Sequence, residues 1–213
     1  RQMCIRDRIG NKRACSFGDI STTSFFPAKP LGCYGDGGAV FTDNDEWAAL
    51  ADSYRVHGKG MFKYDNVRIG MNSRLDTLQA AILKIKFKAF REYELRDINK
   101  AAALYTRLLA GRVKTPVTPE GYYSSWAQYT ICLNSREERD ALQACLKEQG
   151  IPSMVYYPTP MHGQTAYKAL NAPTDCCPTA KRLCDTVLSL PVHPYITEEE
   201  IETVCSVILG FVR

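Results

Sequence analysis

A lysine lies between two prolines in the run PAKP at residues 27–30, and this run restricts the fold more than any other feature of the sequence. Proline fixes its own φ angle and has no backbone N–H to donate, so neither a helix nor a central strand passes through these residues. Residues 20–26 are rich in Thr, Ser and Phe, which is typical of a strand. The sequence therefore predicts that Lys29 lies on a stiff loop at the end of a strand.

Periodicity and turn residues predict the elements on either side of a proline-containing linker at 116–119. Before the linker we expect a strand at 39–42, a helix at about 45–55, a long loop at 56–73, and a helix from Leu75 to about Leu109 with a break near Arg91 left open. After it we expect strands at 126–133 and 153–157, and helices at 136–148, 178–188 and 197–209, the last opened by a capping box. Residues 1–9 show neither the helical period nor the alternation of a strand, and we interpret them as a non-native scar or an unstructured segment.

Composition excludes several classes of protein. The net charge of +4 is modest, and the basic residues are interleaved with acidic ones, so we expect no nucleic-acid partner. No apolar run approaches the roughly 20 residues that span a bilayer, so we expect no membrane partner. The nine cysteines are odd in number and irregularly spaced, which favours a reducing cytoplasm. The adjacent Cys176 and Cys177 are either a redox-active pair or small buried side chains, and we favour the second interpretation.

The residues around Lys29 suggest more than a solvated surface charge, which is the ordinary role of a lysine. Ser24 precedes it by five residues, and the glycine-rich run GCYGDGGA follows at 32–39. Glycines let the backbone approach a bound group closely. A nucleophilic lysine must be partly desolvated and held in place, and a proline-flanked loop supplies that fixing.

Three stretches carry a resemblance to a known family. The runs GDISTTSFFPAKPL at 18–31, HG at 57–58 and IGMNSRLDTLQAA at 69–81 resemble the DegT/DnrJ/EryC1/StrS family of pyridoxal-phosphate-dependent aminotransferases. The runs YP at 157–158, MH at 161–162 and LPVHP at 190–194 fit the small domain of that family in order. The implied fold class is α/β: the C-terminal part of a fold-type-I aminotransferase large domain at 10–115, then a small α+β C-terminal domain at 116–213.

The resemblance implies a role for each candidate residue. Lys29 would form the Schiff base with pyridoxal phosphate and move the substrate proton. Ser24 would bind the cofactor phosphate, and Asn72 would reach it from the neighbouring subunit of a homodimer. Contacts with the substrate are expected from four further side chains: Arg74, His57, Tyr157 and His162. No metal ligands are expected.

Each assignment has a structural alternative. Asn72 or Ser73 would serve equally well as the cap of the following helix. Arg74 would pair with Asp76 or Glu94. Tyr157, His162 and His57 would be structural, as a lone histidine more often is, and His193 is expected to pack within the small domain.

Within the family, the sequence looks closest to enzymes that aminate a UDP-2-acetamido-2-deoxy-3-oxo-glucuronate with glutamate as donor, in cell-surface polysaccharide biosynthesis. A 4-keto nucleotide-sugar aminotransferase is an open alternative. The sugar dehydratase branch has histidine in place of the lysine, so Lys29 argues against it. Family members also have a long segment before the lysine, with an Asp that pairs with the pyridine nitrogen. We therefore expect an N-terminally truncated fragment that is weak or inactive alone, and an inactive fragment or non-catalytic module is the third alternative.

Overall fold

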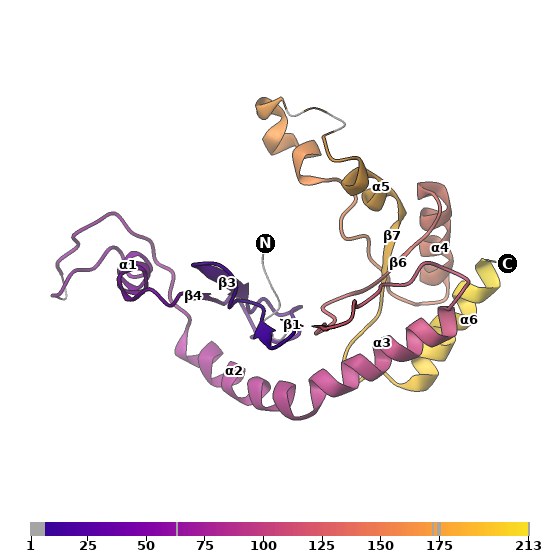
Figure 1. The fold of residues 1–213 in the computed structure, drawn as a ribbon, viewed down its shortest axis with the longest axis horizontal. Coiled ribbons are helices and arrows are strands. Elements are labelled where there is room, and N and C mark those ends of the chain that lie inside the picture. Colours follow the sequence, from indigo (N-terminus) through magenta and orange to yellow (C-terminus); the bar gives the residue numbers. More distant parts are fainter. Residues whose placement is uncertain (1–6, 63, 172, 174–175, 213) are drawn as a thin grey trace. The chain divides into compact units, whose positions relative to one another are not determined.

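The computed structural model describes residues 7–62, 64–171, 173 and 176–212, and Figure 1 shows their fold. The chain forms two compact units, the first from residues up to 95 together with 118–127, the second from 96–117 together with 128–213. The expected boundary at residue 115 differs from this division. The chain leaves the first unit inside a helix, and residues 118–127 then return to it.

A small antiparallel sheet in the first unit explains that return. It consists of β1 (Arg8–Ile9), β2 (Lys12–Arg13) and β5 (Tyr122–Tyr123), in the order β2-β1-β5. The Asp7 carboxylate accepts hydrogen bonds from the backbone N–H of Ser125 at 2.6 Å and from its hydroxyl at 2.8 Å. Residues 7–9 are therefore paired, which differs from the unstructured segment expected at 1–9. Residues 1–6 of that segment lie outside the described part of the chain.

The strand before the lysine loop forms as expected. Strand β3 (Ser21–Ser24) pairs antiparallel with β4 (Gly38–Phe41), in a register that places Ser24 opposite Gly38. Helix α1 (Asp45–Tyr54) follows β4. It begins where the Asn44 side chain accepts a hydrogen bond from the backbone N–H of Trp47 over 3.0 Å, which satisfies one of the N–H groups that a helix start leaves unpaired.

The long helix of the sequence prediction forms in three parts, α2 (Thr77–Ala89), η1 (Phe90–Glu94) and α3 (Leu95–Leu109). The expected break near Arg91 is the π-helical segment η1, which bends or widens a helix without ending it. The first unit's core is a cluster of buried residues with partly buried aromatic rings around it: Leu31, Cys33, Leu83, Phe90 and Leu95, with Phe25, Phe87 and Tyr123. The lysine loop thus shares its core with α2 and η1.

The second unit has a two-stranded antiparallel sheet, β6 (Tyr129–Cys132) with β7 (Val187–Leu190). Helix α4 (Arg136–Glu148) packs against β7, α5 (Pro178–Thr186) and α6 (Glu198–Phe211). Its core is a set of fully buried apolar and aromatic side chains: Tyr105, Leu109, Tyr129, Ile131, Leu142, Leu146, Leu188, Ile201 and Ile208. The capping box expected at the last helix is confirmed, with Thr197 and Glu200 bonded reciprocally.

Three expectations for the second unit were wrong. The strand expected at 153–157 reduces to a single bridge between Met154 and Ser189. The helix expected at 178–188 ends at Thr186, because the next four residues form the buried strand β7. Cys176 and Cys177 are exposed and not small buried side chains. Among the described residues, no helix has the length and apolar character needed to cross a membrane.

Candidate functional site

Lys29 lies on a closed turn after β3. Its backbone N–H donates to the carbonyl of Phe26 over 2.8 Å, and Pro27 and Ala28 occupy the middle of the turn. Proline favours that position because its fixed φ matches the turn. The Lys29 side chain is half-buried. The loop therefore presents a half-buried lysine on a backbone that two prolines restrict.

Backbone contacts fix the rest of this loop. The N–H of Cys33 donates to the carbonyl of Phe25 over 2.8 Å, and the buried Cys33 thiol lies 3.0 Å from the same oxygen. A β-carbon on Gly32 would lie 2.7 Å from the carbonyl oxygens of Phe26 and Pro27, so glycine is required there. The loop that carries Lys29 is thus tied back to the end of β3.

Ser24 is the last residue of β3 and is half-buried. Its hydroxyl oxygen accepts a hydrogen bond from the backbone N–H of Phe26 over 3.0 Å. This bond uses an acceptor site of the hydroxyl and leaves its O–H able to donate. Ser24 can therefore donate to an anionic oxygen without losing its contact with the loop.

His57 lies at the start of a long loop that folds back on itself. Antiparallel bridges join Val56 to Asn72 and Lys59 to Asn66, and the His57 N–H donates to the carbonyl of Met71 over 2.9 Å. His57 has a positive φ of 59° and an exposed side chain. The structure therefore brings the backbone of His57 beside the segment that carries Asn72.

Asn72 and Arg74 interact directly, because the Arg74 Nε donates to the Asn72 Oδ1 over 3.0 Å. The capping role proposed as an alternative for Asn72 or Ser73 is not observed, because the N-cap of α2 is Asp76. The described hydrogen bond of the Arg74 guanidinium goes to Asn72 and not to Asp76. Both side chains are exposed, so the guanidinium keeps donors available for an anion.

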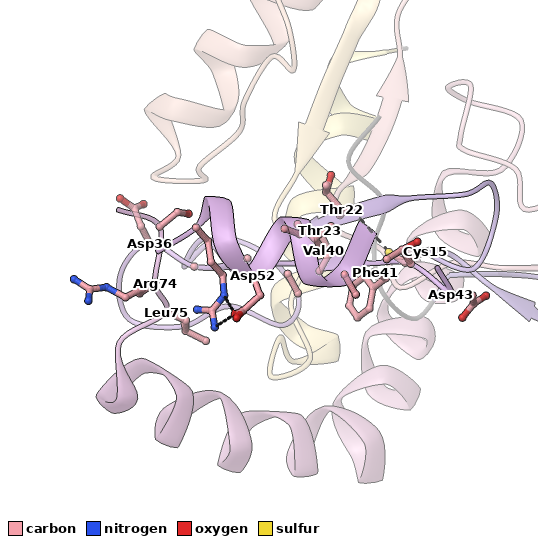
Figure 2. Close-up of a pocket in the computed structure, with 18 of the residues that line it drawn as sticks. Cys15, Thr22, Thr23, Asp36, Val40, Phe41, Asp43, Asp52, Arg74 and Leu75 are labelled. Atoms are coloured by element: carbon pink, nitrogen blue, oxygen red, sulfur yellow. Dashed lines mark hydrogen bonds and ion pairs between the residues drawn. The ribbon is translucent and has the colours of Figure 1, made fainter. Parts of the chain in front are cut away.

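Figure 2 shows a pocket of about 1160 Å³ within the first unit. Strands β3 and β4, helix α1 and the segment 72–76 line it. Its charged and polar side chains include Asp36, Asp52, Arg55, Asn72 and Arg74. Asp52 accepts from Arg55 and pairs with Lys59 at 3.0 Å, and hydrogen bonds from Lys59 and Arg55 lower the pKa of the Asp52 carboxyl.

The pocket gathers part of the expected site. Asn72 and Arg74 line it, whereas Lys29, Ser24 and His57 are not among its lining residues. Thr23 and Gly38, the neighbour and the strand partner of Ser24, do line it. The sequence did not predict the contribution of α1, where Asp52 and the C-cap residue Arg55 lie three residues apart and form an ion pair.

Tyr157 and His162 belong to the second unit. Tyr157 is 66% exposed, and its ring stacks edge-on against Tyr156 with centroids 5.5 Å apart. His162 is half-buried in η2 (Met161–Gly163), close to Cys176 and Cys177. Substrate contact by Tyr157 and His162 therefore stays a prediction.

Comparison with known proteins decides the family. The model of the DegT/DnrJ/EryC1/StrS aminotransferase family matches residues 5–209. The chain belongs to this family. The expected resemblance is therefore confirmed, and residues 5–9 of the segment interpreted as a scar or unstructured fall within the match.

Individual members of the DegT/DnrJ/EryC1/StrS family are also similar to this chain in sequence and structure. A UDP-2-acetamido-2-deoxy-3-oxo-D-glucuronate aminotransferase of Pseudomonas aeruginosa is 42% identical over 196 residues, which cover 92% of this chain and 52% of that protein. A crystal structure of a family aminotransferase from Brucella abortus superposes with a TM-score of 0.92 at 45% identity, covering 98% of this chain and 55% of that one. NtdA from Bacillus subtilis, solved with bound cofactor PMP, has a TM-score of 0.83 at 29% identity, over 93% of this chain and 47% of that one.

These likenesses confirm the expected α/β aminotransferase fold. The chain spans about half the length of the curated relatives that it matches.

Proposed function

We propose that the protein containing this chain is a pyridoxal-phosphate-dependent aminotransferase that transfers an amino group to a keto nucleotide sugar. The observation that carries the proposal is Lys29, half-buried on a loop that two prolines and a backbone turn restrict. Membership of an aminotransferase family supports it. The first unit would belong to the cofactor-binding large domain, and the second would form the small domain.

The residues present fit the cofactor. When bound, pyridoxal phosphate supplies an aldehyde that accepts a primary amine and a ring that withdraws electrons from the adjoining carbon. The Lys29 amine would hold the cofactor and would move the proton at the substrate Cα. Ser24 would donate its free O–H to a phosphate oxygen. Gly32 allows the loop backbone to pass close to the carbonyls of Phe26 and Pro27, where a side chain would clash.

Asn72 and Arg74 would bind anionic groups of the cofactor and the substrate. Asn72 would donate to the cofactor phosphate of the neighbouring subunit, which makes a homodimer the proposed functional form. Arg74 carries a planar guanidinium that pairs with a carboxylate or diphosphate through two parallel bonds. Its bond to Asn72 would orient both groups.

The size of the pocket supports a large substrate. Its volume of about 1160 Å³ lies above the range of roughly 300–1,000 Å³ common for small-molecule sites. Its lining holds five aspartates and two arginines, and Arg55 is paired with Asp52, so Arg74 is the side chain proposed to meet an anionic group of the substrate. We propose a UDP-linked 3-keto-N-acetylglucosamine uronate as substrate, glutamate as donor, and a cytoplasmic role in cell-surface polysaccharide biosynthesis. His57, Tyr157 and His162 remain proposed substrate contacts, and a 4-keto sugar nucleotide is the alternative substrate.

Absorbance spectroscopy tests the cofactor assignment. Pyridoxal phosphate added to the protein should give the visible band of a protein-bound cofactor, and Lys29→Ala should lose it. Lys84→Ala is the matched control, because Lys84 is an exposed lysine of α2 in the same unit. Equal spectra for the protein and Lys29→Ala would remove the basis of the proposal.

A further inference from the structure

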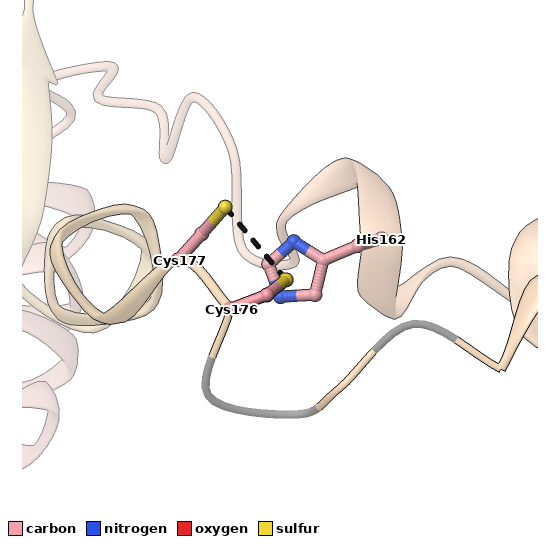
Figure 3. Close-up of side chains that lie close together, drawn as sticks. All are labelled: His162, Cys176 and Cys177. Atoms are coloured by element: carbon pink, nitrogen blue, oxygen red, sulfur yellow. Dashed lines mark hydrogen bonds between the residues drawn. The ribbon is translucent and has the colours of Figure 1, made fainter.

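Three metal-binding side chains meet in the second unit, away from the lysine loop. Figure 3 shows His162, which lies in η2, beside Cys176 and Cys177, which directly precede α5. Their ligand atoms, one from each side chain, all lie within 4.8 Å of one another. Cys176 and Cys177 are exposed and His162 is half-buried. A solvent ion can therefore reach the group without any rearrangement of the core.

The distance between the two sulfur atoms suits a tetrahedral metal. The Cys176 Sγ lies 3.8 Å from the Cys177 Sγ. Two thiolates bound to zinc at about 2.3 Å with a tetrahedral angle are about 3.8 Å apart. A disulfide would instead require about 2.05 Å. The described geometry is thus that of two separate sulfur ligands, and one imidazole nitrogen lies within reach of the same centre.

Charge also favours a divalent cation. Two thiolates neutralise the charge of a zinc ion, while a neutral imidazole supplies the third ligand. Two Cys and one His are a known combination for zinc, with the fourth position left to water or another ligand.

We propose that His162, Cys176 and Cys177 bind a zinc ion. Binding replaces the proton on each thiol, so each zinc ion releases about two protons when both thiols start protonated. The ion links η2 to the start of α5. For His162 this metal role is an alternative to the substrate contact proposed above. Cys176 and Cys177 have no part in the proposed reaction at Lys29.

Cobalt titration tests the site, because Co²⁺ replaces zinc and bonds to thiolates give it an intense charge-transfer band. The reduced, metal-free chain should bind one equivalent of Co²⁺ with this band, and added Zn²⁺ should abolish it. In Cys176→Ser and in Cys177→Ser the affinity for Co²⁺ should fall more than about tenfold. Removing a residue that only hydrogen-bonds to a metal ligand already lowers metal affinity by about that factor. His162→Gln should weaken binding while keeping the sulfur band.

Cys184→Ser is the matched control, because Cys184 is a cysteine within α5 that lies outside the cluster. It should leave the titration unchanged. Circular dichroism of each variant checks that the fold is retained, which the exposure of Cys176 and Cys177 favours. An unchanged titration in the Cys176→Ser, Cys177→Ser double variant would overturn the proposal. So would formation of a disulfide between these cysteines in the presence of equimolar zinc, detected by mass spectrometry.

Discussion

Gly58 and Arg68 approach so closely that a β-carbon on Gly58 would lie 1.8 Å from the carbonyl oxygen of Arg68. Gly58 also has a positive φ of 71°, which side chains other than glycine rarely adopt. Its N–H donates to the Ser53 carbonyl over 2.9 Å. The loop that carries His57 is therefore anchored to α1 at a position where both the backbone angle and the available space require glycine.

Gly58→Ala should destabilise the first unit by about 3 kcal/mol or more, because a clash adds to the cost of the positive φ. Gly121→Ala is the matched control, since Gly121 has a φ of 79° in the same unit and a β-carbon there would meet no atom within 4 Å. It should cost about 1–2 kcal/mol. Urea unfolding followed by tryptophan fluorescence measures both, because Trp47 and Trp126 belong to the first unit. Equal losses would contradict the role given to the clash.

Tyr105 and Tyr129 stack on each other in the second unit, and loss of their hydroxyls should change its stability in opposite directions. Their rings lie 5.0 Å apart, and the Tyr129 hydroxyl bonds to that of Thr106 over 2.8 Å. The buried Tyr105 hydroxyl has no hydrogen-bond partner among the residues that the structure describes. Tyr105→Phe should therefore stabilise the unit by about 1 kcal/mol and Tyr129→Phe should destabilise it by about as much. Urea unfolding by circular dichroism measures both, and a loss in Tyr105→Phe would contradict the assignment.

The capping box of α6 should make stability depend on pH. Hydrogen bonds from the Thr197 backbone and hydroxyl lower the pKa of Glu200 below its ordinary value of 4.5. The ionised carboxylate thus stabilises the fold above pH 4.5, and this contribution is lost as the pH falls through the lowered pKa. The stability advantage over Glu200→Gln should be full at neutral pH and shrink in acid. Glu199→Gln removes an equal charge from the same turn and should retain more of the pH dependence.

Thiol reactivity should separate the cysteines of the metal-free protein. Burial raises the pKa of Cys205 to about 11, and its side chain is 2% exposed. Alkylation requires the thiolate and access, so Cys205 and the buried Cys33 should react far more slowly than Cys176 and Cys177. Peptide mass spectrometry after short exposure to iodoacetamide measures the order. Similar rates in the native protein, and not just in urea, would contradict the burial described.

Local signals explain what the sequence could predict. The lysine loop follows from two prolines, and the starts of α4 and α6 follow from capping side chains within one turn. The break near Arg91 has a local cause as well, because the buried Phe90 and Leu95 are five residues apart. That spacing matches the π-helical bond from the Leu95 N–H to the Phe90 carbonyl.

The remaining features depend on contacts distant in sequence. Strand β7 is buried at all four positions, so it has no alternation to separate it from the end of α5. The bond between Asp7 and Ser125 joins residues 118 positions apart. The pocket lining contributed by Asp52 and Arg55 depends on how α1 lies beside β3 and β4, which no local pattern records. The proximity of His162 to Cys176 also depends on how the chain folds between them, which no local pattern records.

Borohydride trapping tests directly whether Lys29 is the residue that binds pyridoxal phosphate. The chain is incubated with one equivalent of pyridoxal phosphate, reduced, digested and mapped by mass spectrometry. We predict that the pyridoxyl group lies predominantly on Lys29, ahead of the more exposed Lys84 and Lys88. Labelling spread over the exposed lysines, with Lys29 unmodified, would contradict it.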